Sequence, residues 1–438
     1  MNIMNTESGI YDARKLGLPK MVLLGLQHTF AMFGATVLVP IITGLSVSTT
    51  LLFVGLGTLL FHLITKGKVP AFLGSSFAFL GGYAMVAPLV DGNPNTELLP
   101  YACGGVVAAG FMYILLAALI KGFGVKKVMR FFPPIVTGPI IISIGLILAP
   151  TAVSSASTDW LLAVIALAVI IICNIWGKGM IKIIPILLGI VISYAVAIML
   201  GRVDFTAVHS AEFFAMAPIT MAKFSISATL TIMPIALATM MEHIGDIAAI
   251  SATTGKNYIS DPGLHRTMLG DGLATSFAGL FGAPANTTYG ENTGVLALTK
   301  VYDPKVMEIA AVFAILLSFI PKFGEAIRTI PTAIIGGVSF ILYGMISAIG
   351  VRNVVENKVD FTKSRNLIIA AIIMVSAIGF NGIGGLTFVI SEQLSISLSG
   401  LAIAAILGIL LNAILPGNDY EFKDTPVEEI PDSNFRLK

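Results

Sequence analysis

The stretch Leu161-Leu-Ala-Val-Ile-Ala-Leu-Ala-Val-Ile-Ile-Ile-Cys173 is apolar at every position. A membrane β-strand would alternate apolar and polar residues, because only one of its faces meets lipid. A segment that is apolar on all sides is expected to cross the bilayer as an α-helix, which satisfies its own backbone hydrogen bonds. This stretch therefore predicts the fold class, an all-α polytopic membrane protein.

The composition of the whole chain agrees with this stretch. Of its 438 residues 56% are hydrophobic and only 11% are charged, and the mean hydropathy is +0.92. A soluble domain has about 25% charged residues. The formal net charge of +2 gives no reason to expect a nucleic-acid partner. Cys103 and Cys173 both lie in apolar stretches, where packed thiols are expected rather than a metal site. The sequence predicts no cofactor and no metal.

Apolar stretches of about 20 residues, each long enough to cross the ~30 Å hydrocarbon core, predict fourteen spans. They run over about 20–44, 47–65, 70–90, 100–120, 131–150, 159–177, 181–200, 225–250, 266–283, 284–300, 304–321, 328–350, 364–388 and 396–415. With the N-terminus in the cytoplasm, 22 of the 26 Lys and Arg residues fall on the cytoplasmic side. The charges therefore predict an even number of spans and two cytoplasmic termini.

Two pairs of short motifs recur at nearly the same spacing. Gln27-His28 matches Glu242-His243, and Ser75-Ser76-Phe77-Ala78 matches Thr287-Thr288-Tyr289-Gly290. The repeated unit then holds seven spans, and because seven is odd the second copy enters the membrane inverted. Inverted repeats are typical of secondary transporters, in which the substrate site lies near the midplane where spans are broken.

The chain divides accordingly into a cytoplasmic N-terminus (1–19), a first seven-span repeat (20–200), an external connection (201–224), a second, inverted repeat (225–415) and a cytoplasmic tail (416–438). The third and tenth spans are interrupted by Gly, Pro, Ser and Thr. We expect each to begin as a short extended stretch, and the two stretches to pair as antiparallel strands at the substrate site. Gly336-Gly337 in the twelfth span predicts a surface for close helix packing.

Three of the carboxylates within the predicted spans belong to the runs that hold the repeated motifs: Glu242, Asp246 and Glu291. An ionisable group at membrane depth costs at least ~2.5–3.5 kcal/mol, so it is expected to have a function. Asp246 follows Glu242 by four residues and shares its helical face. Its role stays open between proton coupling or gating and a hydrogen bond between helices. His28 is expected to bond to Glu242 or Asp246, as a structural residue or as a proton carrier, and Tyr343 is a weaker gating candidate.

Other residues of the broken spans complete the predicted site. Phe77 and Tyr289 occupy matched positions in the two repeats, which favours a role at the site over simple packing. Asn292 is expected to cap or brace the half-helix that follows. Ser76 and Thr288 are predicted structural residues beside it.

The run Glu291-Asn-Thr-Gly-Val-Leu-Ala-Leu-Thr-Lys300 resembles the signature of the nucleobase–ascorbate transporter family, which is Glu, Gln or Pro followed by Asn-x-Gly-x4-Thr and a basic or small residue. Gln27-His-Thr-Phe-Ala-Met-Phe-Gly34, Leu73-Gly-Ser-Ser-Phe-Ala-Phe79 and Asp261-Pro-Gly-Leu-His-Arg266 are similar to that family's bacterial uracil permeases. These motifs lie between about residues 20 and 365. One residue departs from the pattern, because Asp246 stands at the position of a histidine.

The resemblance implies a core of spans 1–4 and 8–11 and a gate of spans 5–7 and 12–14. The substrate-binding residues that it implies are Glu242, Glu291, Phe77, Gly290, Tyr289 and Ala31. The two carboxylates would accept the N–H groups of a pyrimidine, and the backbone amides of Phe77 and Gly290 would serve its carbonyl oxygens. Glu at the first signature position is similar to uracil permeases, whereas purine transporters have Gln there and ascorbate transporters have Pro.

The implied function is proton-coupled uracil import across the cytoplasmic membrane by alternating access, with uracil or a related base, protons and the bilayer as partners and a homodimer formed through the gate spans. A purine (xanthine or urate) permease is the nearest alternative. An anion exchanger or channel would require basic residues near the broken spans, and none lies in 74–82 or 284–299. The chain carries no His-Glu-x-x-His or Gly-x-Ser-x-Gly motif, so we do not expect an enzyme.

Overall fold

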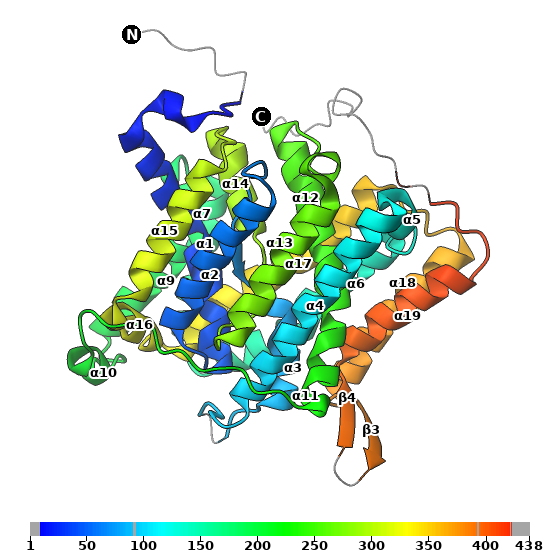
Figure 1. Ribbon diagram of the computed structural model, residues 1–438. Helices are drawn as coiled ribbons and strands as arrows, with labels where there is room; N and C mark the ends of the chain where they lie inside the picture. Colours follow the sequence, from blue (N-terminus) through cyan, green and yellow to red (C-terminus); the bar gives the residue numbers. More distant parts are fainter. Residues whose placement is uncertain (1–8, 91–92, 392–393, 421, 423–438) are drawn as a thin grey trace.

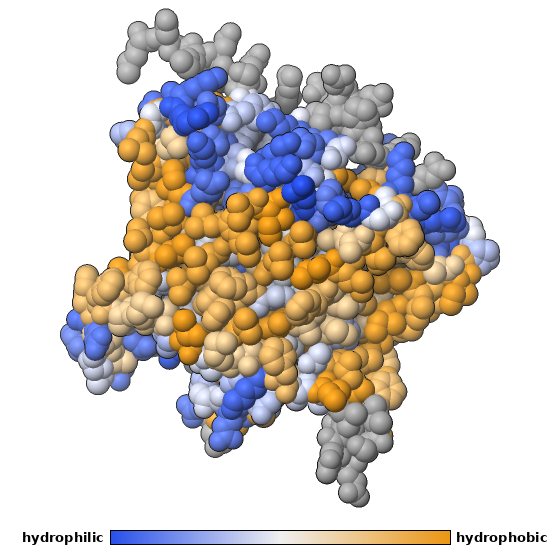
Figure 2. Space-filling model, viewed as in Figure 1, coloured by the Kyte–Doolittle hydropathy of each residue, from blue (hydrophilic) through white to orange (hydrophobic). Residues whose placement is uncertain are grey.

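The computed structural model describes residues 9–90, 93–391, 394–420 and 422, and it is mostly helical (Figure 1). Within these residues seven helical segments are long and apolar enough to cross a membrane. They are α1 (Leu18–Thr43), α2 (Val47–Ile64), α4 (Leu99–Phe123), α6 (Pro134–Ala156), the continuous pair α11 (Ile226–Ile232) and α12 (Ala236–Thr254), α17 (Thr332–Glu356) and α18 (Ser364–Gly382). Figure 2 shows an apolar belt between two polar rims, as expected of a multi-pass membrane protein.

The other helices are shorter. The pair α15 (Lys305–Ser318) and α16 (Pro321–Arg328) bends by 86° and adds an eighth span if it is counted as one. The remaining α-helices are α3 (Leu80–Val86), which follows a 3-10 turn (Phe77–Phe79), α5 (Val125–Met129), α7 (Trp160–Trp176), α8 (Met180–Ile183), α9 (Pro185–Met199), α10 (Thr206–Ser210), α13 (Leu264–Leu280), α14 (Gly290–Thr299) and α19 (Gly400–Ile414). A helix or half-helix lies in each of the fourteen predicted segments, whereas the number that cross the bilayer and the inverted repeat stay predictions.

The most extensive helix contacts define two groups of helices. In the first group α4 lies along α13, α2 along α13 and α15, and α1 along α15. In the second, α6 lies along α17 and α18, α7 along α9 and α17, and α18 along α19. The predicted close packing at Gly336 is confirmed, because a Cβ there would lie 2.2 Å from the backbone nitrogen of Ala156. Only glycine allows α17 to approach α6 so closely.

A β-hairpin between α18 and α19 corrects the predicted spans over 364–388 and 396–415. Helix α18 ends at Gly382, and α19 begins at Gly400. Between them β3 (Leu386–Ser391) pairs with β4 (Leu394–Leu398) in antiparallel register. Gly384 and Gly385 have φ values of +81° and +92°, in the left-handed region that ends a helix. The predicted spans extend into β3 and β4 because these strands are also apolar, and a short apolar run does not by itself distinguish a strand from a helix.

The segment before α1 is attached to the protein body. The backbone N–H of Ala13 donates to Oδ2 of Asp303 over 2.7 Å, and the hydroxyl of Tyr11 donates to the backbone oxygen of Thr254 over 2.5 Å. These bonds connect the chain before α1 to the end of α12 and to the loop after α14. This attachment is not among the features predicted from the sequence.

Candidate substrate site

Two short strands cross at the centre of the predicted site. Strand β1 (Leu73–Ser75) pairs antiparallel with β2 (Asn286–Thr288), with Gly74 opposite Thr287. All six residues are buried. Strand β1 leads into the 3-10 turn before α3, and β2 leads into α14. The predicted strand pair is therefore confirmed, and it brings together segments that are more than 200 residues apart.

The side chain of Tyr289 fastens this strand pair. Its hydroxyl donates to the backbone oxygen of Ser75 over 2.9 Å and lies 3.2 Å from the Ser75 hydroxyl. Its ring covers Gly74, where a Cβ would lie 2.1 Å from the ring. The hydroxyl of Tyr289 is therefore used within the protein, and its ring holds the two strands together.

Each strand leads directly into the start of a helix. Among the described residues, no side chain forms a capping hydrogen bond at either start. Tyr289 is the N-cap of α14 and Ser76 is the N-cap of the 3-10 turn. The first N–H groups of a helix have no partner inside it, so they are available to an acceptor. Gly290, the first residue of α14, is exposed. The Ser76 hydroxyl is buried and has no hydrogen-bond partner among the described residues.

The three predicted carboxylates lie together beside the strand crossing. Glu242 and Asp246 are on α12 and Glu291 is the second residue of α14, and all three are half-buried. They lie close enough to repel one another when ionised, and Asp271 of α13 adds to this repulsion. In a medium of low dielectric such a cluster favours partners that supply protons or N–H donors.

Asp246 is bonded to the strand crossing. The Thr288 hydroxyl donates to Oδ2 of Asp246 over 2.7 Å. Of the two roles left open by the sequence, the structural hydrogen bond is thus present, although its partner belongs to a strand rather than to a helix.

His28 lies elsewhere than expected. Its side chain is fully buried, and its neighbour is Asn292 rather than a carboxylate of α12. The Asn292 side-chain amide donates to the backbone oxygen of His28 over 3.1 Å and lies 3.1 Å from its Nδ1. His28 meets Asn292 because α1, which carries His28, packs against α14. Asn292 therefore braces the half-helix α14 against α1.

Phe77 and Tyr343 meet across the two helix groups. Their rings are 5.8 Å apart between centroids, edge to face, and both are buried. The cavity beside Phe77, which reaches Ile144 and Leu148 of α6, holds only about 10 Å³, too little for a nucleobase. Ala31 is also buried, one turn beyond His28 on α1. On this side the two groups are in closed contact.

One buried pair is not among the residues predicted from the sequence. Nδ1 of His243 lies 2.8 Å from Oδ2 of Asp271, and both side chains are 0% exposed. The rings of Phe61 and Tyr113 meet the imidazole edge-on. The sequence does carry a signal for this pair, since Asp271 is an ionisable residue within the predicted span 266–283.

A multi-pass helical fold in which two broken spans cross beside clustered carboxylates is that of a membrane transporter. A model of the Permease family matches residues 19–383, and the chain belongs to this family. The resemblance to nucleobase–ascorbate transporters, and to the uracil permeases among them, is thereby confirmed, and the protein is a permease rather than an enzyme.

Curated relatives match nearly the whole chain. A probable uracil permease of Pasteurella multocida is 43% identical over 425 residues, covering 94% of this chain and 96% of that protein. The uracil permease of Bacillus caldolyticus is 43% identical over 411 residues, covering 90% and 92%. That of Escherichia coli K12 is 40% identical over 420 residues, covering 93% and 94%.

Solved structures share the fold at low identity. The transmembrane domain of the cyanobacterium bicarbonate transporter BicA superposes with a TM-score of 0.58 at 15% identity, covering 93% of this chain and 99% of that chain. SLC26A9 gives a TM-score of 0.67 at 12% identity, covering 92% and 66%. At these identities the likeness shows the fold alone.

Proposed function

We propose that the protein imports uracil together with protons across the cytoplasmic membrane by alternating access. The observation that carries the proposal is the cluster formed by Glu242, Asp246 and Glu291 beside the uncapped start of α14. The relatives named as uracil permeases support uracil as the substrate.

The chemistry of the ring fits these groups. Uracil alternates N–H donors with carbonyl acceptors. Glu242 and Glu291 accept its N–H groups in charge-assisted hydrogen bonds, which are the stronger kind. The backbone amides of Phe77 and Gly290 donate to its carbonyl oxygens. Tyr289 and Ala31 form the walls around the ring.

Proton coupling follows from the charge of the cluster. A carrier that holds uracil with several ionised carboxylates in its interior resists reorientation, because moving unpaired charges through a low-dielectric region is costly. A proton bound to Asp246, or shared between Asp246 and Glu242, lowers this cost while uracil occupies the site. In this proposal His28 acts through Asn292, and Tyr343 acts at the gate side.

The movement takes place between the two helix groups. The first group, α1–α4 with α11–α15, is the proposed core and carries the strand crossing and the carboxylates. The second, α6, α7, α9 and α17–α19, is the proposed gate. The helices pack more extensively within each group than between the groups, which supports this division, and the Phe77–Tyr343 contact is the one we expect to open. The proposal includes two cytoplasmic termini and a homodimer through the gate.

Uptake of labelled uracil into proteoliposomes tests the proposal. We expect an inward proton gradient to stimulate uptake, a protonophore to abolish the stimulation, and unlabelled uracil to compete while xanthine, urate and bicarbonate do not. An uptake rate that is the same with and without the proton gradient would contradict proton coupling. Competition by xanthine as strong as that by uracil would indicate a purine permease instead.

A further inference from the structure

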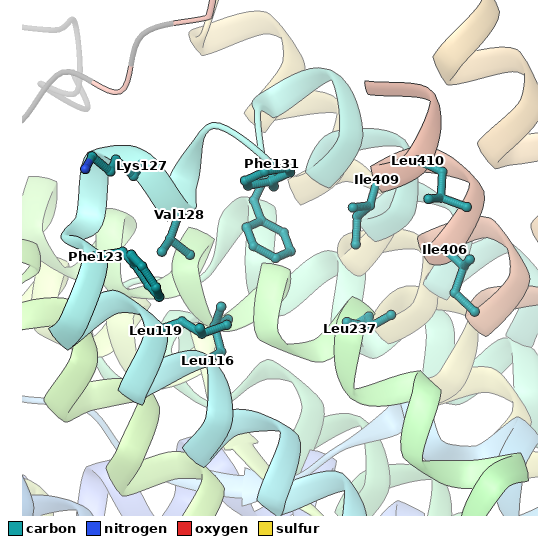
Figure 3. Close-up of a pocket in the computed structure, with 11 residues that line it drawn as sticks. Leu116, Leu119, Phe123, Lys127, Val128, Phe131, Leu237, Ile406, Ile409 and Leu410 are labelled. Carbon is teal, nitrogen blue, oxygen red and sulfur yellow. The ribbon is translucent and has the colours of Figure 1, made fainter. Parts of the chain in front are cut away.

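A groove outside the substrate site opens on the apolar surface between α4, α5, α12 and α19 (Figure 3). Its volume is about 530 Å³. Leu119 and Phe123 line one side, Leu237 the floor, and Ile409 and Leu410 the other side. Phe123 is 63% exposed and Leu410 is 48% exposed, so the groove is open to its surroundings. In a membrane protein those surroundings are lipid.

The polar end of the groove is basic. Among the described residues that line the groove, Lys127 alone is charged, and Figure 3 shows it at the edge of the apolar lining. Lys121, Lys126 and Arg130 are exposed in the same segment. The chain has no Asp or Glu between residues 116 and 132. The charge of this end is complementary to an anion.

The walls of the groove are fixed to each other at this end. The Asn412 side-chain amide, on α19, donates to the backbone oxygen of Arg130 over 3.0 Å. The Arg365 guanidinium donates to Oδ1 of Asn412 over 2.8 Å and to its backbone oxygen over 2.7 Å. The bonds hold α19 near α5, so the opening is a built part of the fold.

We propose that this groove binds an acyl chain of an anionic phospholipid, with the lipid phosphate on Lys127. An apolar slot open to the bilayer suits an acyl chain, since each buried methylene adds to the binding. Basic residues at the membrane surface attract anionic headgroups, and basic pockets between membrane helices bind them. The positive-inside distribution assigns the headgroup to the cytoplasmic leaflet.

This lipid also affects transport, a consequence that rests on the proposed function. Leu119 and Leu237 belong to the proposed core, and Leu410 belongs to the proposed gate. An acyl chain that lies between these residues contacts both the core and the gate. It therefore opposes a change in the distance between the two groups.

Tryptophan quenching by brominated lipid tests the site on the full chain in nanodiscs. The two native tryptophans, Trp160 and Trp176, are replaced by Phe, and Leu410→Trp places a reporter at the rim of the groove. At equal mole fraction we expect brominated phosphatidylglycerol to be favoured at the reporter over brominated phosphatidylcholine by about fivefold, the value for one lysine. Adding Lys127→Gln removes this preference.

Two matched controls accompany the reporter. Leu316→Trp, at a position of α15 that is 56% exposed and outside the groove, is quenched equally by both lipids. Lys305→Gln removes an exposed lysine away from the groove and keeps the preference at the Leu410→Trp reporter. Equal quenching by the two lipids at that reporter, or a preference that survives Lys127→Gln, overturns the proposal. Quenching at the Leu410→Trp reporter that falls as the ratio of protein to lipid rises also overturns the proposal, because a second copy of the protein then covers the groove. Since no transport is measured, the result is independent of the proposed function.

Discussion

The hydroxyl of Thr288 donates a hydrogen bond to the carboxylate of Asp246 across 2.7 Å. This bond joins β2 to α12. The strand sets the start of α14 at Gly290, and α12 carries Glu242 one turn before Asp246. The bond therefore fixes the amide and the carboxylate that we propose to contact opposite edges of one substrate.

Thr288→Val removes this donor with little change in shape. Because a hydrogen bond contributes about 0.5–1.5 kcal/mol, and more when its acceptor is charged, we expect a lower midpoint of thermal unfolding in detergent and weaker uracil binding. Thr288→Ser keeps the hydroxyl and serves as the matched control. Equal stability and equal binding of the two variants would count against the bond.

The buried pair of His243 and Asp271 is expected to couple α12 to α13. Removing one partner of a buried polar pair leaves the other polar group unsatisfied, which costs about 1–3 kcal/mol. We expect His243→Gln and Asp271→Asn each to be strongly destabilising, and the double variant to lose less than their sum. A double-mutant cycle on the free energy of unfolding measures the coupling.

The exposed pair of Arg352 and Glu356 provides the comparison for that cycle. Nε of Arg352 lies 2.7 Å from Oε1 of Glu356, and both side chains are about half exposed. We expect Glu356→Gln to cost no more than about 1 kcal/mol. Additive effects of His243→Gln and Asp271→Asn would show that the buried contact carries no coupling.

Gly74→Ala is expected to disrupt the strand crossing. The new methyl group would lie 2.1 Å from the Tyr289 ring, which is held by its bonds to Ser75. Overpacking of this kind costs about 1–3 kcal/mol. Gly294→Ala is the control, because nothing lies within 4 Å of its Cβ position in α14. Thermal unfolding and uracil binding are the readouts, and a Gly74→Ala protein that matches Gly294→Ala in both would refute the close contact.

The pH dependence of uptake separates a positioning residue from a proton carrier. His28 is buried and bonded to Asn292, so we expect His28→Gln to lower uptake while leaving its rise with falling external pH intact. Asp246→Asn removes a proton-binding group of the cluster, and we expect its uptake to become nearly independent of pH. The opposite pattern would assign the proton to His28.

The sequence was most informative where local chemistry conflicts with the membrane. Glu242, Asp246 and Glu291 were found because carboxylates are costly in lipid, and the strand pair was found because Gly, Ser and Thr interrupt two matched spans. The partner of His28 was not predictable, because it depends on which helices become neighbours. The same holds for the groove, in which Leu119 and Leu410 approach each other across nearly 300 residues of chain.

Equilibrium binding of labelled uracil to Glu242→Gln and Glu291→Gln tests the central claim most directly. Each substitution replaces a charged acceptor by a neutral group of the same shape. Loss of about 1.5–3 kcal/mol raises the Kd roughly 10- to 100-fold. Glu325→Gln, at a half-buried glutamate of α16, leaves the Kd unchanged. We expect both site variants to bind weakly while their unfolding temperatures stay near that of the parent. Binding equal to the parent in both would contradict the account.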